Sequence, residues 1–180
     1  MLRNVILPLC LVTIVPFALG ADEPASKTVS TSGIAFQVPE SWKATQPTSS
    51  MRKSQLQVAP VEGDKAPAEM VLYVFGGGAG TVQANITRWQ SQFKAADGSA
   101  PDVETKKVKG QNAEVTRVEC AGTYTDPFSK TGPQENYRLL GAIVQTEDAG
   151  YFFKLIGPDK TVKSAEPAFD AMLKSIKTGK

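Results

Sequence analysis

Alternating apolar and polar positions predict a series of short β-strands. Residues 34–38 place Ile, Phe and Val on one side of the chain and Ala and Gln on the other, and Pro39 ends the run. Six consecutive apolar residues at 70–75 predict a strand that is covered on both faces. Further strands are predicted at residues 51–58, 103–108, 113–124, 135–146 and 151–156. Short loops join neighbouring strands, which favours antiparallel pairing.

Apolar residues spaced three and four apart predict two helices. The first apolar stripe consists of Val82, Ile86, Trp89 and Phe93. It predicts a helix over residues 82–95, and Thr81 is suited to cap its N-terminus. The second stripe lies within residues 162–176. Pro167 suits a first turn better than a helix interior, which places the start of this helix near Ser164.

This order of elements predicts one α+β domain. Strands, a helix, more strands and a helix fit an antiparallel β-sheet of about six strands with α-helices packed on its faces. We expect the domain to cover residues 33–180, because no linker or internal repeat divides the chain. Residues 21–32 are polar and have no apolar periodicity, so they are predicted to be a flexible leader.

The N-terminal residues have the pattern of a signal peptide. Arg3 precedes an uncharged apolar run at residues 5–19, which is shorter than the roughly 20 residues of a membrane-spanning helix. Small residues before Ala21 suit cleavage there, so residues 1–20 are predicted to be removed. An uncleaved anchor is the alternative. We therefore expect an extracytoplasmic chain, periplasmic or secreted, with no stable membrane insertion after cleavage.

Composition narrows the possible chemistry. The chain has no histidine, which excludes Ser-His-Asp and Cys-His catalysis and His-ligated metals. Cys10 leaves with the signal peptide, so Cys120 has no partner for an internal disulfide, and its strand position predicts a buried, inert thiol. The net charge is +2, and the largest basic run, at 106–109, reads as a solvated strand surface. We expect no nucleic-acid partner, no cofactor and no metal.

Carboxylates remain available for catalysis, but the sequence does not pair them. The candidates are Glu114, Glu119, Asp126, Glu135 and Asp170. Residues five apart in a strand, such as Glu114 and Glu119, face opposite sides unless a bulge intervenes. No glycosidase-like pair of carboxylates can therefore be named.

The glycine-rich stretch at residues 76–80 is the most suggestive local motif. Backbone N–H groups at a helix start can hold an anion, and the candidate contacts are Gly76, Gly77, Gly78 and Thr81. A Walker loop requires Gly-Lys-Ser or Gly-Lys-Thr, whereas this stretch continues as Gly-Thr-Val. A dinucleotide fingerprint requires a parallel βαβ unit, which the pattern does not offer. A purely conformational role of the glycines is the favoured alternative.

Four large side chains are further candidates for a binding surface. They are Arg52, Arg88, Trp89 and Tyr137. Arginine and aromatic residues are favoured anchors at interfaces. The alternative for each one is a place at the edge of the core or on a solvated face.

Three segments resemble the PsbP-like superfamily. They read IAFQVPESW at 34–42, YFFKLIGP at 151–158 and FDAMLKSI at 169–176. This superfamily includes photosystem PsbP proteins, Mog-type Ran-binding proteins and many exported bacterial proteins of unknown role, and residues 75–93 resemble the exported bacterial members most. The resemblance implies a PsbP/Mog-like α/β/α sandwich and a non-enzymatic role. It assigns no metal-binding or partner-binding residue.

The leading hypothesis is therefore an exported, non-catalytic binding or assembly module. Its ligand would be an unidentified protein partner or a small ligand. One alternative is a histidine-free hydrolase or lyase that uses carboxylates near the glycine-rich loop. Another is a cell-envelope structural protein, which broad apolar exposure would favour.

Overall fold

The computed structural model describes residues 25–77, 79–126 and 131–179. The predicted signal peptide, residues 1–20, lies outside the described residues. The strands of the described part are β1 (Ser26–Thr31), β2 (Ile34–Pro39), β3 (Lys43–Ala44), β4 (Arg52–Val58), β5 (Ala68–Gly76), β6 (Phe93–Lys94), β7 (Glu104–Lys109), β8 (Glu114–Tyr124), β9 (Gln134–Gln145), β10 (Ala149–Pro158) and β11 (Lys177–Thr178). The helices are α1 (Val82–Gln90) and α2 (Asp159–Ser175).

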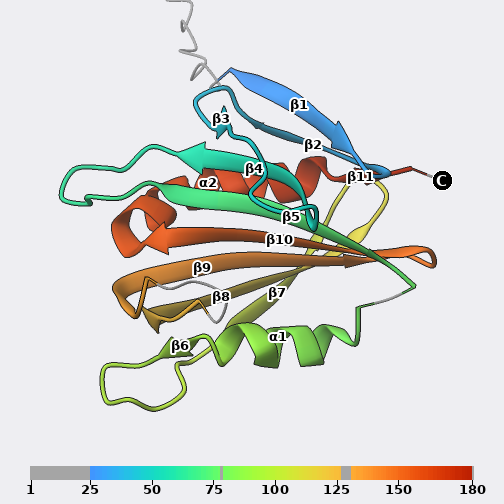
Figure 1. Cartoon of the computed structure of the whole chain (residues 1–180). Coiled ribbons are helices and arrows are strands. Elements are labelled where there is room, and N and C mark those ends of the chain that lie inside the picture. The colour runs from blue at the N-terminus through green and yellow to red at the C-terminus, as the bar shows by residue number, and fades with distance from the viewer. Residues whose placement is uncertain (1–24, 78, 127–130, 180) are drawn as a thin grey trace, which may run out of the picture.

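The strands form two antiparallel sheets. The large sheet has the order β3-β4-β5-β10-β9-β8-β6, and β7 also pairs with β8. The small sheet has the order β1-β2-β11. The helix α2 and the small sheet lie on one face of the large sheet, and α1 lies on the other (Figure 1). This arrangement confirms the predicted α+β sandwich, with more strands than the expected six.

The central strands bury both of their faces, because alternate side chains enter two separate apolar clusters. In β10, Phe153 and Leu155 join the cluster on the α2 side, while Phe152 joins the cluster on the α1 side. In β5, Met70 and Leu72 pack on the α2 side. This alternation is the reason that residues 70–75 read as a continuous apolar run.

The prediction of a flexible leader at residues 21–32 is wrong for residues 26–31. These residues form β1, whose six positions pair with β2 from Ser26 opposite Pro39 to Thr31 opposite Ile34. The strand is an edge strand of the small sheet, so most of its side chains stay at the surface and its sequence is polar. A polar edge strand lacks the apolar alternation by which strands are recognised.

Both helix boundaries differ from those predicted. The first helix ends at Gln90, and Phe93 keeps its apolar contacts from β6, where it pairs with Tyr124. The second helix begins at Asp159 rather than near Ser164, and Pro167 lies inside it. Its first turn is capped by a residue that is distant in the sequence. The Asp64 carboxylate accepts hydrogen bonds from Thr161 N (2.8 Å) and Oγ1 (2.7 Å).

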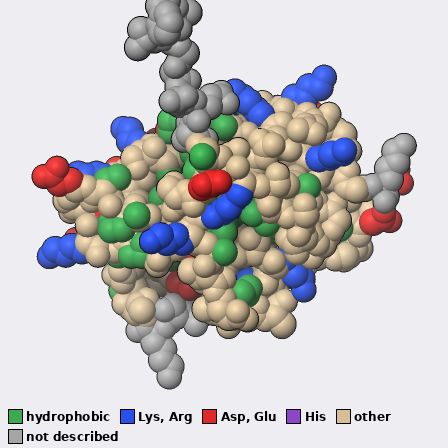
Figure 2. Space-filling model, turned by 90° about the horizontal axis from the view of Figure 1, so that it is seen from above, with side chains coloured by type: hydrophobic (Ala, Val, Ile, Leu, Met, Phe, Trp, Pro, Cys, Tyr) green, Lys and Arg blue, Asp and Glu red, His purple; other side chains and the backbone are tan. Residues whose placement is uncertain are grey.

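The outer surface on the side of the small sheet is mixed rather than apolar. Lysine, arginine and acidic side chains are spread over this face, and apolar side chains are scattered between them (Figure 2). Among the large apolar side chains of the described residues, only Met51 is exposed. Neither described helix is long and apolar enough to cross a membrane.

Candidate functional site

The helix α1 covers only part of its face of the large sheet. Nine residues of helix are about 13 Å long, whereas the twelve residues of β9 extend over about 40 Å. The helix is fastened by Trp89, which is 3% exposed and meets Phe152 edge-on with ring centroids 6.4 Å apart. A Cβ atom at Gly141 would overlap the Trp89 ring, so the glycine lets the indole lie on the backbone of β9.

Lys154 lies on the central strand β10, on the same side of the sheet as α1 and next to the glycine on which Trp89 packs. Its register partners are Val71 of β5 and Gly141 of β9, and Phe152 and Ile156 flank it on the same face of the strand. The side chain is half-buried, and Nζ donates a hydrogen bond to Gln92 Oε1 at 2.8 Å. We call the surface around it the Lys154 face. Its members are Arg52, Tyr73, Gln92, Tyr124, Tyr137 and Lys154.

Tyrosines form the aromatic part of the Lys154 face. The Tyr124 ring centroid is 5.9 Å from Lys154 Nζ, within the range of a cation–π contact. Tyr124 and Tyr137 are stacked, with centroids 6.1 Å apart and an interplanar angle of 7°. Burial raises the pKa of Tyr73, Tyr124 and Tyr137, so these hydroxyl groups are neutral hydrogen-bond donors at physiological pH.

Arg52 reaches the Lys154 face because of a β-bulge. The register of β4 shifts between Arg52 and Ser54, which places Arg52 rather than Lys53 opposite Tyr73. Its Nη1 donates to Glu69 Oε2 at 2.6 Å and to Gln55 Oε1 at 3.1 Å. Its Cζ lies 6.0 Å from the Tyr73 ring centroid.

The surroundings of Lys154 disfavour its charged form. Burial lowers the pKa of Lys154 from 10.5 to about 8. The negative charge of Asp126 acts in the opposite direction, whereas the positive charges of Arg88 and Arg52 lower the pKa further. A central strand position with these properties would be filled more stably by an apolar residue, which marks Lys154 as a functional candidate.

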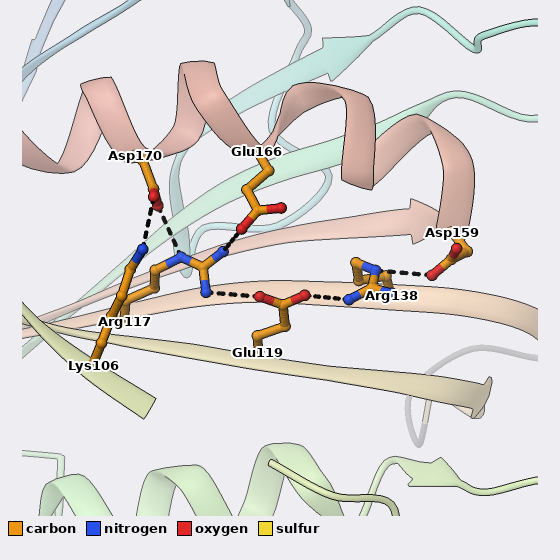
Figure 3. A network of polar contacts seen from close by, with 7 residues as sticks. All are labelled: Lys106, Arg117, Glu119, Arg138, Asp159, Glu166 and Asp170. Carbon is orange, nitrogen blue, oxygen red and sulfur yellow. Dashed lines mark hydrogen bonds and ion pairs between the residues drawn. The ribbon is translucent and has the colours of Figure 1, made fainter. Parts of the chain in front are cut away.

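A second charged cluster lies on the opposite face, between the sheet and α2 (Figure 3). The Arg117 side chain is 4% exposed and donates to three carboxylates: Asp170 at 2.8 Å, Glu119 at 2.7 Å and Glu166 at 2.5 Å. Arg138 continues the network by bonding Glu119 and also Asp159, the latter at 2.8 Å. Lys106 is 2.8 Å from Asp170.

This network holds α2 against the sheet rather than presenting a catalytic pair. Arg117 and Glu119 come from β8, whereas Glu166 and Asp170 come from α2 and are one helical turn apart. Each carboxylate accepts hydrogen bonds from a fixed guanidinium group, so its charge is already compensated. Within the described residues, no group of three or more His, Cys, Asp or Glu side chains is placed to hold a metal ion.

The glycine-rich loop satisfies its polar groups internally where it is described. Gly77 has a φ of +72°, and its N–H donates to Asp148 O at 3.1 Å. The buried Asn85 side chain donates to Ala79 O and Thr81 O, both at 2.9 Å. Thr81 caps α1, since its Oγ1 accepts from Ala84 N at 3.1 Å. These contacts agree with the conformational role.

The other two glycines of the predicted site are Gly76 and Gly78. Gly76 ends β5 and is exposed, like Gly77. Gly78 lies outside the described residues. The anion contacts of this loop stay a prediction.

The structure places the four predicted anchor residues in different environments. Arg52 and Tyr137 lie on the Lys154 face. Arg88 is exposed on α1, bonds Asn85 Oδ1, and acts electrostatically on Lys154. The prediction of a surface anchor is wrong for Trp89, because this side chain belongs to the core.

The sequence analysis did not single out Lys154, although a lysine inside YFFKLI interrupts an otherwise apolar strand.

Two surface hollows lie away from the Lys154 face. One, of about 410 Å³, is bordered by β1, β2 and β11. The other, of about 440 Å³, lies along β7 and the start of β8. Neither is lined by a member of the Lys154 face.

Comparison with known proteins identifies similar structures but no similar sequences. No family model and no curated protein matches the chain. The structure resembles the solution structure of cyanobacterial PsbP (CyanoP) from Synechocystis, with a TM-score of 0.55 and 13% identity over 89% of this chain and 97% of that one. It also resembles PA94 of Pseudomonas aeruginosa, a protein of unknown function, with a TM-score of 0.46 and 10% identity over 80% and 90% of the two chains. At such identities, the first likeness concerns the fold alone.

Removing the buried cation of the α2 network should strongly destabilise the protein. Arg117→Met leaves Glu119, Glu166 and Asp170 without their central partner, so we expect a loss of about 3–5 kcal/mol in the free energy of unfolding. The matched control is Lys107→Met. Its ion pair with Glu114 is exposed on both sides (62% and 70%), so its loss should cost less than about 1 kcal/mol. Equal effects in urea unfolding would contradict this role of the network.

Lys154→Met should stabilise the protein in a pH-dependent way. Below pH 8 the lysine is charged in both the folded and the unfolded state, and only the folded state bears the cost of burying that charge. Between pH 8 and 10.5 the folded state loses its proton first, so the stability of the wild type rises with pH.

We therefore expect the variant to be more stable than the wild type at pH 6–7, with a difference that shrinks from pH 8 to 10.5. Urea unfolding across this range measures the effect. A variant less stable than the wild type at pH 6–7 would contradict it.

Proposed function

We propose that this chain, which has the PsbP-like fold expected from its sequence, is an exported, non-catalytic binding or assembly module whose partner docks on the Lys154 face. The observation that carries the proposal is the half-buried lysine at the centre of the sheet, which lies beside Tyr124 and bonds Gln92 just beyond the end of α1. This position weakens the fold, so its residue type points to a role outside the fold.

The residue types of the Lys154 face suit protein docking. Tyrosine and arginine are enriched among residues that dominate binding energies, because each combines a large contact area with hydrogen-bond donors. Tyr73, Tyr124 and Tyr137 are half-buried, so their rings are held in place by the sheet while their outer edges remain accessible. A partner would therefore meet a surface that needs little reorganisation.

The alternatives have less support from the described residues. A carboxylate-dependent hydrolase or lyase would need a carboxylate pair in a cleft, whereas Glu119, Glu166 and Asp170 converge on Arg117. A cell-envelope structural protein would expose broad apolar surface, whereas in the part of the chain that the structure describes Met51 is the one large apolar side chain that is exposed. The extracytoplasmic location is supported by the signal-peptide pattern of residues 1–20.

The test is affinity capture with matched lysine variants. The tagged chain beginning at Ala21 is used to capture proteins from its native extracytoplasmic fraction, and near-stoichiometric partners are identified by mass spectrometry. We expect one dominant partner with the wild type and with Lys163→Met, whose lysine is exposed on α2. Lys154→Met should lose this partner while remaining folded.

Three results would overturn the proposal. Absence of any near-stoichiometric partner, or equal retention by Lys154→Met and Lys163→Met, would contradict docking on the Lys154 face. A reproducible turnover that is abolished by Glu166→Gln would contradict the non-catalytic role. Thermal unfolding of each variant confirms that a lost partner does not reflect a lost fold.

A further inference from the structure

We propose that the Lys154 face binds a carboxylate from an acidic segment of the partner protein, held by the Lys154 ammonium and the Arg52 guanidinium group. This inference rests on the proposed function and specifies the chemistry of the partner. It follows from hydrogen-bond donors that the fold leaves unused, from the local charge and from the shape of the surface.

The Lys154 ammonium has spare donors that point to an oxygen ligand. An ammonium carries three N–H bonds, and within the described residues one of them is used, by Gln92. The Tyr124 ring contributes a cation–π contact but no oxygen atom. A carboxylate can accept from the other two N–H bonds and, as an anion, gives the stronger charge-assisted hydrogen bonds.

Arg52 offers a second set of unused donors on the same face. Its hydrogen bonds to Glu69 and Gln55 both come from Nη1, so its Nη2 and Nε donors have no partner among the described residues. The contact with Glu69 fixes the guanidinium plane over Tyr73. This fixation reduces the entropy that Arg52 loses when it binds a second carboxylate.

The local charge also favours an anion. The cations that act here are Lys154, Arg52 and Arg88, and the carboxylates are Asp126 and Glu69. Glu69 is already bonded by Arg52 and by Gln55, the latter at 2.7 Å. Burial is the largest cause that lowers the Lys154 pKa, and an added anion would favour the charged ammonium, as Asp126 does.

The partial exposure of these side chains on a strand surface points to a protein segment as the source of the carboxylate. Small ligands are usually held in concave pockets that bury most of their surface. The side chains of the Lys154 face are instead half-buried members of a sheet surface, and they line neither of the two hollows described above. Tyrosine rings on such a face provide contact area for the residues that flank an acidic side chain.

The first test uses capped synthetic peptides of alternating glutamate and glycine, with glutamine or lysine in place of glutamate as controls. Binding is followed by NMR of the ¹⁵N-labelled chain that begins at Ala21. We expect only the glutamate peptide to shift the signals of Gln92 and Lys154. Lys154→Met should weaken this binding about tenfold or more, and Lys163→Met should leave it unchanged. Equal binding of the glutamate and glutamine peptides, or no binding at all, would overturn the inference.

The pH dependence provides a second readout. Affinity for the glutamate peptide should fall between pH 7 and pH 9, because Lys154 loses its charge near pH 8. Lys154→Met should show no such fall. The other charged or titratable groups near Lys154 are Arg52, Glu69, Tyr73, Arg88, Cys120, Tyr124, Asp126 and Tyr137. Cys120 stays protonated over this range, because burial raises its pKa to about 12.

The two proposals can fail separately. If capture of the native partner depends on Lys154 but the glutamate peptide does not bind, the docking function stands and the carboxylate inference is wrong. If the peptide binds as expected but no native partner is captured, the site binds acidic segments and the proposed assembly role is wrong.

Discussion

Coverage of the large sheet is the constraint on which the rest of the structure depends. Its central strands carry apolar side chains on both faces, so each face needs a second layer. On one face, the seventeen residues of α2 and the small sheet form that layer, and the Arg117 network holds the helix in place. On the other face, the nine residues of α1 cannot extend along the strands, so part of the face remains open.

Incomplete burial explains how a lysine can occupy a central strand. Lys154 lies where α1 gives way to Gln92, and the Tyr124 ring and the Gln92 amide partly replace the water that its ammonium loses. This replacement is incomplete, because burial still lowers the pKa of Lys154 to about 8. In the proposed function, the features that make the position unfavourable for the fold are also the donors for an anionic partner, so that stability is given up for binding.

Local pattern was enough to predict the six longer strands of the main sheet, because most of them carry their own apolar periodicity. It did not predict the two-residue strands β3 and β6. Features that depend on distant contacts were not predictable: β1 is recognisable only through its pairing with β2, and the start of α2 depends on Asp64, 97 residues before Thr161. The Lys154 face depends on the end of α1 and on the bulge in β4 that aims Arg52. Its one local signal was the lysine in YFFKLI.

The titration of Lys154 tests most directly the claim that a functional lysine is held in an unfavourable position. The Nζ signal of ¹⁵N-labelled lysine can be followed by NMR as the pH is raised, with Lys154→Met used to assign it. The structure predicts a pKa of about 8 for Lys154, below the ordinary lysine value of 10.5. A Lys154 pKa near 10.5 would contradict the account, because it would mean that the ammonium is fully hydrated and that its position costs the fold nothing.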